Sequence, residues 1–182
     1  SNTIAGLLSN MINSFEDGGS TIVSQNYGNS NGRRIKKFFI INFIYICSMC
    51  IVGTIVLYAL KSSIAKFFAP NDLLNQEMII NIFKWECLDI IFMGLSGVAM
   101  SIFYGFGKTR ITMALSMSTL FVFRIPTLLI LVNVVHMNYE ACGLAMFISN
   151  TASGSLAFIL ALLFLIMIPK KPKYQFLFKQ NE

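Results

Sequence analysis

Long, uninterrupted runs of apolar residues dominate the chain. Two of them contain no charged residue: residues 38–60, a run of 23, and residues 141–168. A helix rises about 1.5 Å per residue and the hydrocarbon core of a bilayer is about 30 Å thick, so about 20 apolar residues cross it. Both runs are therefore predicted to be membrane-spanning helices.

Three further runs have a similar length but contain charged residues. Arg124 interrupts residues 111–135, charges lie in the outer half of residues 78–106, and two adjacent acids make residues 3–27 the weakest span. A backbone inside lipid must satisfy its own hydrogen bonds, and these runs are continuous, unlike the short alternating segments of a β-barrel. We therefore expect an all-α membrane protein with about five transmembrane helices.

The composition supports this class and excludes others. Of the 182 residues, 55% are hydrophobic and only 12% are charged, whereas a soluble domain carries about 25% charged residues. The chain is too apolar for a disordered protein, and four cysteines are too few for a disulfide scaffold. The net charge of +6 comes from clusters that flank the apolar runs. Nucleic acid is therefore not an expected partner.

The basic clusters predict the orientation in the membrane. They follow the first, third and fifth runs, whereas the opposite connectors, residues 69–77 and 136–140, carry acids and no Lys or Arg. Because Lys and Arg are enriched in cytoplasmic loops, we expect a multi-pass plasma-membrane protein with residues 170–182 as a basic cytoplasmic tail. Ten of the 14 basic residues share that side: Arg33, Arg34, Lys36, Lys37, Lys108, Arg110, Lys170, Lys171, Lys173 and Lys179.

Two lysines depart from this distribution. Lys61 and Lys66 lie toward the opposite side and are predicted to reach the membrane surface from an amphipathic extension, residues 61–68. The first run has no basic segment before it and therefore does not resemble a signal peptide. An odd number of spans and the lack of an initiator Met lead us to expect a fragment, or one half of a larger protein.

Ionisable residues inside the apolar runs are the candidate functional groups, because a charge in lipid is costly. Arg124 lies at the centre of its run and Glu16 within a residue or two of the centre of its own. Asp89 lies about one helical turn outward of the centre of its run. These charges share one layer, so we expect Arg124 to pair with Asp89 or Glu16.

Glu86 and Asp89 are three residues apart and share a helix face. A carboxylate in a dry cavity takes up a proton or binds sodium, which is the chemistry of an ion-coupled transporter. The alternative is that these acids only neutralise Arg124 and Lys84. No metal or cofactor other than a coupling ion, with sodium at Asp89 as one choice, is expected.

Polar and small residues in the last two runs have two interpretations. Asn150 and Ser153 mark a small polar face that either packs tightly against a neighbouring helix or lines a cavity. Pro126 is expected to kink its helix beside Arg124 and to act as a hinge or a cavity wall. With a single His and cysteines inside or near the apolar runs, neither a zinc site nor a catalytic set is predicted, so we expect no enzyme.

Four short stretches resemble the multidrug and toxic compound extrusion (MATE) transporters. Residues 20–28 (STIVSQNYG) resemble the end of the second helix of a MATE bundle, and residues 102–110 (IFYGFGKTR) the family's Gly-x-Gly-basic stretch. Residues 123–126 (FRIP) are similar to its penultimate helix and residues 140–145 (EACGLA) to the entry to its last helix. The stretches follow the family's order across nearly the whole chain.

The resemblance implies a fold and an activity. Members have twelve helices in two six-helix bundles, and this chain would be helices eight to twelve, the carboxyl-terminal bundle without its first helix. Members export cationic or amphipathic compounds in exchange for sodium or protons. A carboxylate on the tenth helix belongs to the cation site in many members, and Asp89 or Glu86 would have that role here. The implied partners are the substrate, membrane lipid and the missing amino-terminal bundle.

The expected mechanism is competition. A proton or sodium ion at Asp89, together with Glu16, displaces a cationic substrate from a cavity lined by Phe and Met residues. Three alternatives remain open: a lipid-linked saccharide flippase of the same superfamily, a non-transporting membrane subunit, and an intramembrane enzyme, the weakest of the three. A flippase needs a more cationic cavity than these residues offer, because its substrate carries a pyrophosphate.

Overall fold

The computed structural model describes residues 2–68, 70, 73–136, 140–170 and 172–178. Every regular element within these residues is helical. The elements are α1 (Asn2–Gly28), α2 (Gly32–Phe68), α3 (Leu73–Gly105), α4 (Thr109–Ser118), the π-helical turn η1 (Thr119–Arg124), α5 (Ile125–Asn133), α6 (Glu140–Met167) and the 3-10 turns η2 (Ile168–Lys170) and η3 (Pro172–Leu177).

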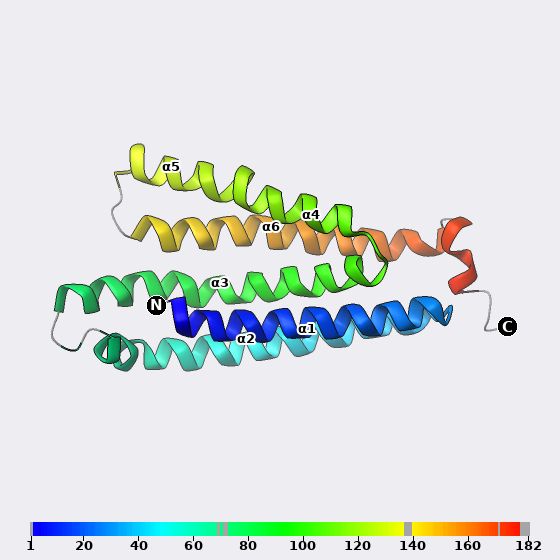
Figure 1. Cartoon of the computed structure of the whole chain (residues 1–182), viewed down its shortest axis with the longest axis horizontal. Helices are drawn as coiled ribbons and strands as arrows, with labels where there is room; N and C mark the ends of the chain where they lie inside the picture. Colours follow the sequence, from blue (N-terminus) through cyan, green and yellow to red (C-terminus); the bar gives the residue numbers. More distant parts are fainter. Residues whose placement is uncertain (1, 69, 71–72, 137–139, 171, 179–182) are drawn as a thin grey trace.

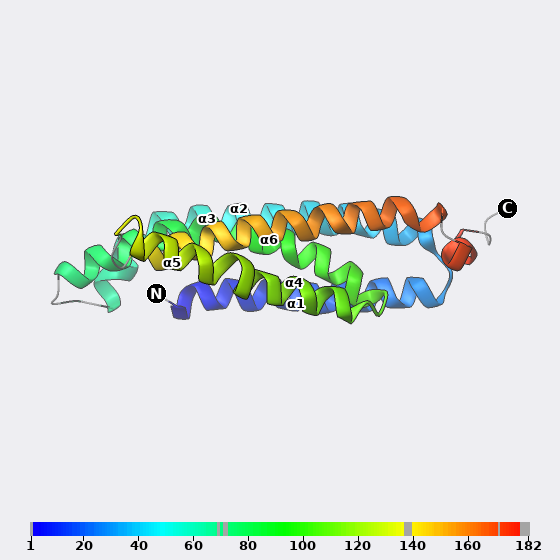
Figure 2. The ribbon, with the colours of Figure 1, turned by 90° about the horizontal axis from the view of Figure 1, so that it is seen from above.

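The long helices lie side by side in an elongated bundle (Figure 1). Helix α3 is its centre and packs against α1, α2 and α6, while η1 and α5 pack on the far side of α6. Seen from above, α1 and α4 lie on one face of the bundle and α2 and α6 on the other, while α3 crosses obliquely from the second face to the first (Figure 2). The space between α1 and α4 is therefore bounded by α3 and α6.

Four helical segments are long and apolar enough to cross a membrane within the described part of the chain. They are Gly32–Phe67, Leu73–Gly105, Thr109–Asn133 and Ala141–Lys170, and they confirm an all-α membrane protein. The weakest predicted span, residues 3–27, is helical as α1 but is not among the four. Glu16, Asp17 and several Ser, Asn and Gly residues lower its hydropathy.

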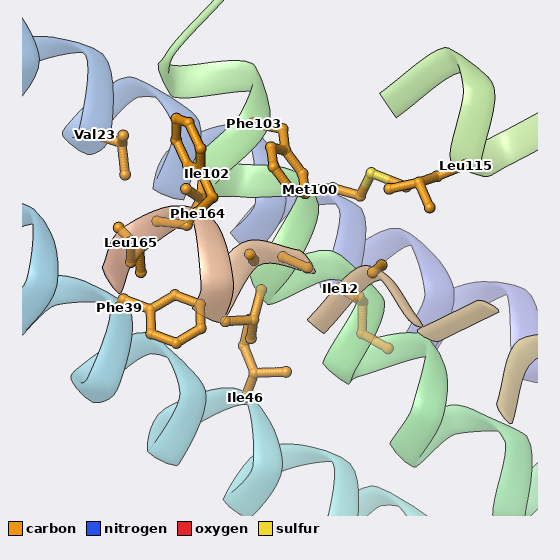
Figure 3. Close-up of a cluster of buried hydrophobic side chains, with 14 of the residues drawn as sticks. Ile12, Val23, Phe39, Ile46, Met100, Ile102, Phe103, Leu115, Phe164 and Leu165 are labelled. Atoms are coloured by element: carbon orange, nitrogen blue, oxygen red, sulfur yellow. The ribbon is translucent and has the colours of Figure 1, made fainter. Parts of the chain in front are cut away.

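The buried core lies where α3 contacts its neighbours (Figure 3). Val23 of α1, Ile46 of α2, Ile102 of α3 and Leu165 of α6 are each at most 5% exposed. Glycines let the backbones approach closely: a Cβ at Gly154 would lie 2.5 Å from the carbonyl oxygen of Phe92. The tight α3–α6 contact fixes the spacing of the helices that carry the candidate site.

The kink predicted at Pro126 takes the form of a π-helical turn just before it. The backbone N–H of Ile125 donates to the carbonyl of Leu120, five residues earlier. Proline has no N–H and its ring clashes with the preceding turn, so a regular α-helix cannot run through this position. The widened turn η1 absorbs the mismatch, and Arg124 is its last residue.

The extension predicted for residues 61–68 is the continuous end of α2. Ala65 is fully buried and Lys66 is exposed, as expected for an amphipathic segment. The Nζ atom of Lys61 lies 3.8 Å from the centroid of the Tyr58 ring. Helices α2 and α3 extend beyond the other helices at this end (Figure 1).

The basic connectors gather at one end of the bundle, where the α1–α2 and α3–α4 connections and the carboxyl terminus meet (Figure 1). This end is called the basic end below, and the opposite one the acidic end. The described part of the predicted tail forms a short helical turn. Its turn η3 packs on the basic end, where Tyr174 is 6% and Leu177 1% exposed. Lys36 lies over the Phe178 ring, 5.3 Å from its centroid.

Candidate functional site

Two polar cavities adjoin inside the bundle. The basic-end cavity, about 400 Å³, is lined by α1, α3, α4, η1 and α6. The acidic-end cavity, about 320 Å³, is lined by α1, α3, η1 and α6. Met93, Arg124 and Asn150 line both cavities and so form the wall between them.

The basic-end cavity has Glu16 as its acid. The side chain reaches this position because Gly97 of α3 lets α1 come close: a Cβ at Gly97 would lie 3.1 Å from Ile12 Cγ2 and 3.7 Å from Glu16 Oε2. Ser153 and Asn150 of α6 also line the cavity. Both interpretations of this small polar face therefore apply: Asn150 and Ser153 line a cavity, and Gly154 beside them packs tightly against α3.

The acidic-end cavity brings Glu86 and Asp89 together, one turn apart on α3. Oε2 of Glu86 and Oδ1 of Asp89 are buried and have no hydrogen-bond partner within the described residues. An uncompensated carboxylate oxygen in an apolar interior is costly, so these two atoms favour a proton or a cation beside them. The cavity has oxygen ligands of the kind that sodium prefers.

A hydrogen-bonded chain runs from η1 through α6 to α3. Arg124 donates from Nη2 to Oδ1 of Asn150 at 3.2 Å and from Nε to Oγ of Ser149 at 3.3 Å. Asn150 in turn donates from Nδ2 to Oδ2 of Asp89 at 2.9 Å. The carboxamide of Asn150 thus accepts from the cation with one end and donates to the carboxylate with the other.

This chain corrects the expected direct pairing of Arg124. No ion pair joins Arg124 to Asp89 or Glu16 among the described side chains; the contact with Asp89 is relayed by Asn150. The reason is steric, since Asn150 lies between the two charged groups and its amide matches both. Arg124 shares the lining of one cavity with Glu16 and of the other with Glu86 and Asp89.

The other predicted residues have different positions. Pro126 lines neither cavity and follows Arg124 by two residues at the start of α5. Lys84 donates to Asn81 Oδ1 at 3.3 Å and lines neither cavity. Neutralisation of the acids by Lys84 is therefore not what the structure shows.

Ser149 and Met93 contribute to the site without having been predicted as site residues. Ser149 is fully buried, and its hydroxyl accepts from Arg124 and donates to the Met146 carbonyl at 3.0 Å. The signal was its place beside Asn150 in an otherwise apolar run. Met93 lies on the Glu86–Asp89 face of α3, one turn further along.

A bundle of membrane helices with charged groups in internal cavities is typical of a multi-pass membrane transporter. The family model MatE matches residues 1–130, and the chain therefore belongs to the MATE family of transporters, which are not enzymes. The matched range includes Glu16, Glu86, Asp89 and Arg124. Neither the curated proteins nor the solved structures contain a significant match to the chain.

Proposed function

We propose that the protein is a cation-coupled antiporter that exports cationic or amphipathic compounds. The coupling ion, a proton or sodium, binds at Asp89 and Glu86 in the acidic-end cavity. The exported compound binds in the basic-end cavity beside Glu16. The single observation that carries this proposal is the pair of unpartnered carboxylate oxygens, Glu86 Oε2 and Asp89 Oδ1, in a cavity that shares its wall with a second cavity.

The basic-end cavity suits a compound that is both apolar and positively charged. Its volume of about 400 Å³ lies in the range of small-molecule sites. Met93 and Met100 give it flexible apolar walls, and Tyr104 gives it an aromatic one. Glu16 supplies the negative charge that a cationic group needs.

Arg124 and Asn150 connect the two events. A cation at Asp89 competes with the hydrogen bond from Asn150, and the same amide holds Arg124 at the wall of the basic-end cavity. Ion binding in one cavity therefore changes the charge presented to the other. This arrangement supports exchange, in which ion and compound are bound alternately.

The competing transport function is less well supported. A flippase for lipid-linked saccharides has to neutralise a pyrophosphate, yet Arg124 is the only cationic residue among the described lining residues of the two cavities. Glu16, Glu86 and Asp89 outnumber it. The distribution of charged loops supports an orientation with the basic end in the cytoplasm.

The test is the replacement Asp89→Asn in the full-length protein. We expect gradient-driven efflux of a cationic dye to fall by about tenfold or more, because one missing charge at a coupling site removes the ion's main ligand. Membrane insertion should be unchanged. The matched control is Asp17→Asn, an exposed acid of α1 that lines neither cavity.

Each other result has a definite meaning. Unchanged efflux in Asp89→Asn contradicts the coupling role, and an equal loss in the Asp17→Asn control shows a general effect of removing an acid. If the unmodified protein moves the dye at the same rate with and without an ion gradient, it is not an ion-coupled antiporter. If it does not move the dye under either condition, the non-transporting subunit is the better interpretation.

A further inference from the structure

A third hollow lies away from the two cavities, between α2 and α3 near the acidic end. It has a volume of about 390 Å³ and is lined by Thr54, Tyr58, Lys84, Trp85, Cys87 and Leu88. It shares no lining residue with the basic-end or acidic-end cavity. We propose that this groove binds an anionic phospholipid, with the phosphate between Lys61 and Lys84 and an acyl chain along the groove.

The depth of the groove matches the boundary between lipid and water. At about 1.5 Å per residue, about 20 residues span the hydrocarbon core. Counted from Lys37 at the basic end of α2, the opposite boundary is reached near Tyr58, and counted back from Gly105 on α3 it is reached near Trp85. Two independent helices therefore place the same groove at one interface, where Tyr and Trp are enriched.

Two ammonium groups flank the mouth of the groove. Lys84 lines it directly and is exposed, while Lys61 lies 3.8 Å above the ring of Tyr58, which also lines it. In the described part of the chain, neither lysine forms an ion pair with an acid; Lys84 bonds only the neutral amide of Asn81. Their positive charges are left to attract an anion.

Below the lysines the groove is apolar. Leu88 and Tyr58 are 43% and 50% exposed, so the wall is open to the side where lipid lies. The hydroxyl of Thr54 donates to the carbonyl of Cys87 at 2.9 Å and so presents no free donor to an occupant. Trp85 is held against Phe147 of α6, with ring centroids 5.8 Å apart. These surfaces fit an acyl chain.

The charge of the groove selects among amphipathic occupants. Two ammonium groups repel a cationic compound of the kind assigned to the basic-end cavity, and they attract a phosphate that has no compensating cation on its own headgroup. An anionic phospholipid combines that phosphate with an acyl chain. The lysines also explain why basic residues occur at the end of the bundle whose connectors are otherwise acidic.

The test measures lipid retention by native mass spectrometry. The full-length protein is exchanged into micelles that contain equal amounts of phosphatidylglycerol and phosphatidylcholine, and the bound fractions are compared. Variants K61Q and K84Q and the double variant are compared with K66Q, an exposed lysine on the same helix that does not line the groove. We expect the preference for phosphatidylglycerol to fall about fivefold for each lysine removed from the groove and to persist in K66Q.

Three outcomes overturn the proposal. The first is equal retention of the two lipids by the unmodified protein, which would show that the groove binds acyl chains without discriminating between headgroups. The second is an equal loss in K66Q and in the groove variants, which would show a diffuse effect of net charge. The third is an unchanged preference in the double variant. All four variants change lysines outside the buried core, so we expect them to fold. The readout is lipid retention, which does not depend on dye efflux.

Discussion

Both ends of the Asn150 amide are hydrogen-bonded to charged neighbours. Its oxygen accepts from Arg124 and its nitrogen donates to Asp89, which fixes the orientation of the carboxamide. Asn150 therefore does what neither a carboxylate nor an apolar side chain of that size can do, because one end must accept and the other must donate.

Replacement Asn150→Leu is expected to destabilise the protein by about 1–3 kcal/mol, since it leaves two charged groups without their partner. The readout is the thermal unfolding of purified protein in detergent. Ser153→Ala is the matched control: Ser153 is buried on the same helix face one turn along and is not part of the chain of hydrogen bonds. An Asn150→Leu variant as stable as Ser153→Ala would show that the relay contributes nothing.

Asp89 and Arg124 should also be coupled energetically, although they do not touch. The double variant of Asp89→Asn and Arg124→Gln is expected to lose less stability than the sum of the single variants. In an Asn150→Ala background the difference should shrink, because the hydrogen-bonded link is gone and only the direct attraction of the two charges remains. Thermal unfolding of the seven variants of this cycle and of the unmodified protein measures the coupling. Additivity in the unmodified background would mean that the two charges are independent.

At this scale the sequence predicts which charged residues lie inside the bundle better than it predicts their partners. Glu16, Glu86, Asp89 and Arg124 stand out because charges inside apolar runs are rare, and all four line a cavity. The expected direct pair was wrong because the rise per residue predicts depth only. The rotation of each helix about its axis decides which side chain lies between two others, and Asn150 is placed by that rotation.

The fourth apolar run, residues 111–135, is not one regular helix, because a π-helical turn interrupts it. A regular α-helix turns by about 100° per residue, whereas η1 inserts a wider turn between α4 and α5. The turn therefore sets the relative rotation of α4 and α5, and with it the direction of Arg124 at the wall of both cavities.

Replacement Pro126→Ala restores a backbone donor and removes the ring that clashes with η1. We expect the helix to become more regular and the protein to be at least as stable, while efflux falls because Arg124 turns away from Asn150 and Ser149. Thermal unfolding and dye efflux, measured on the same preparation, separate the two effects. Thr127→Ala, at a half-buried neighbour on α5, is the control. Equal efflux in both variants would show that η1 has no role in transport.

The predicted helices agree with the structure where hydropathy decides. Residues 38–60, 78–106, 111–135 and 141–168 each overlap a helical segment long and apolar enough to span a membrane. The π-helical form of η1 was not predicted, because hydropathy does not encode which carbonyl an N–H bonds. Turn η3 was not predicted for a different reason: the four lysines of residues 170–182 indicate only a basic tail, whereas the turn depends on the contacts of Tyr174 and Leu177 with the rest of the bundle.

The basic end of the whole molecule is closed by an aromatic cluster. Tyr174 of η3 packs against Phe106 and Phe164, with ring centroids 5.9 and 6.0 Å away, and near Tyr27 at 6.4 Å. Lys108 lies 4.9 Å from the centroid of the Phe164 ring. The end of the chain thereby joins α1, the α3–α4 connector and α6.

Replacement Tyr174→Ala is expected to lower the stability of the bundle by about 3 kcal/mol, as for other large aromatic truncations in a core. The change should also speed protease cleavage at the two connectors of the basic end. Phe176→Ala serves as the comparison, since Phe176 is 42% exposed although it contacts Tyr27. If the two variants lose the same stability, Tyr174 is not the residue that holds the turn in place.

The helices that surround the two cavities are joined by two kinds of contact. The chain from Arg124 to Asp89 links η1, α6 and α3 by directional hydrogen bonds, and Gly154 lets α6 approach the backbone of α3. Helix α1 is joined to α3 mainly by close packing at glycines: Gly97 lies against Ile12, and Gly105 against Val23. The position of Glu16 at the basic-end cavity therefore depends on the shape of uncharged residues, and a larger side chain at Gly97 would push the only acid of that cavity's described lining away from its wall.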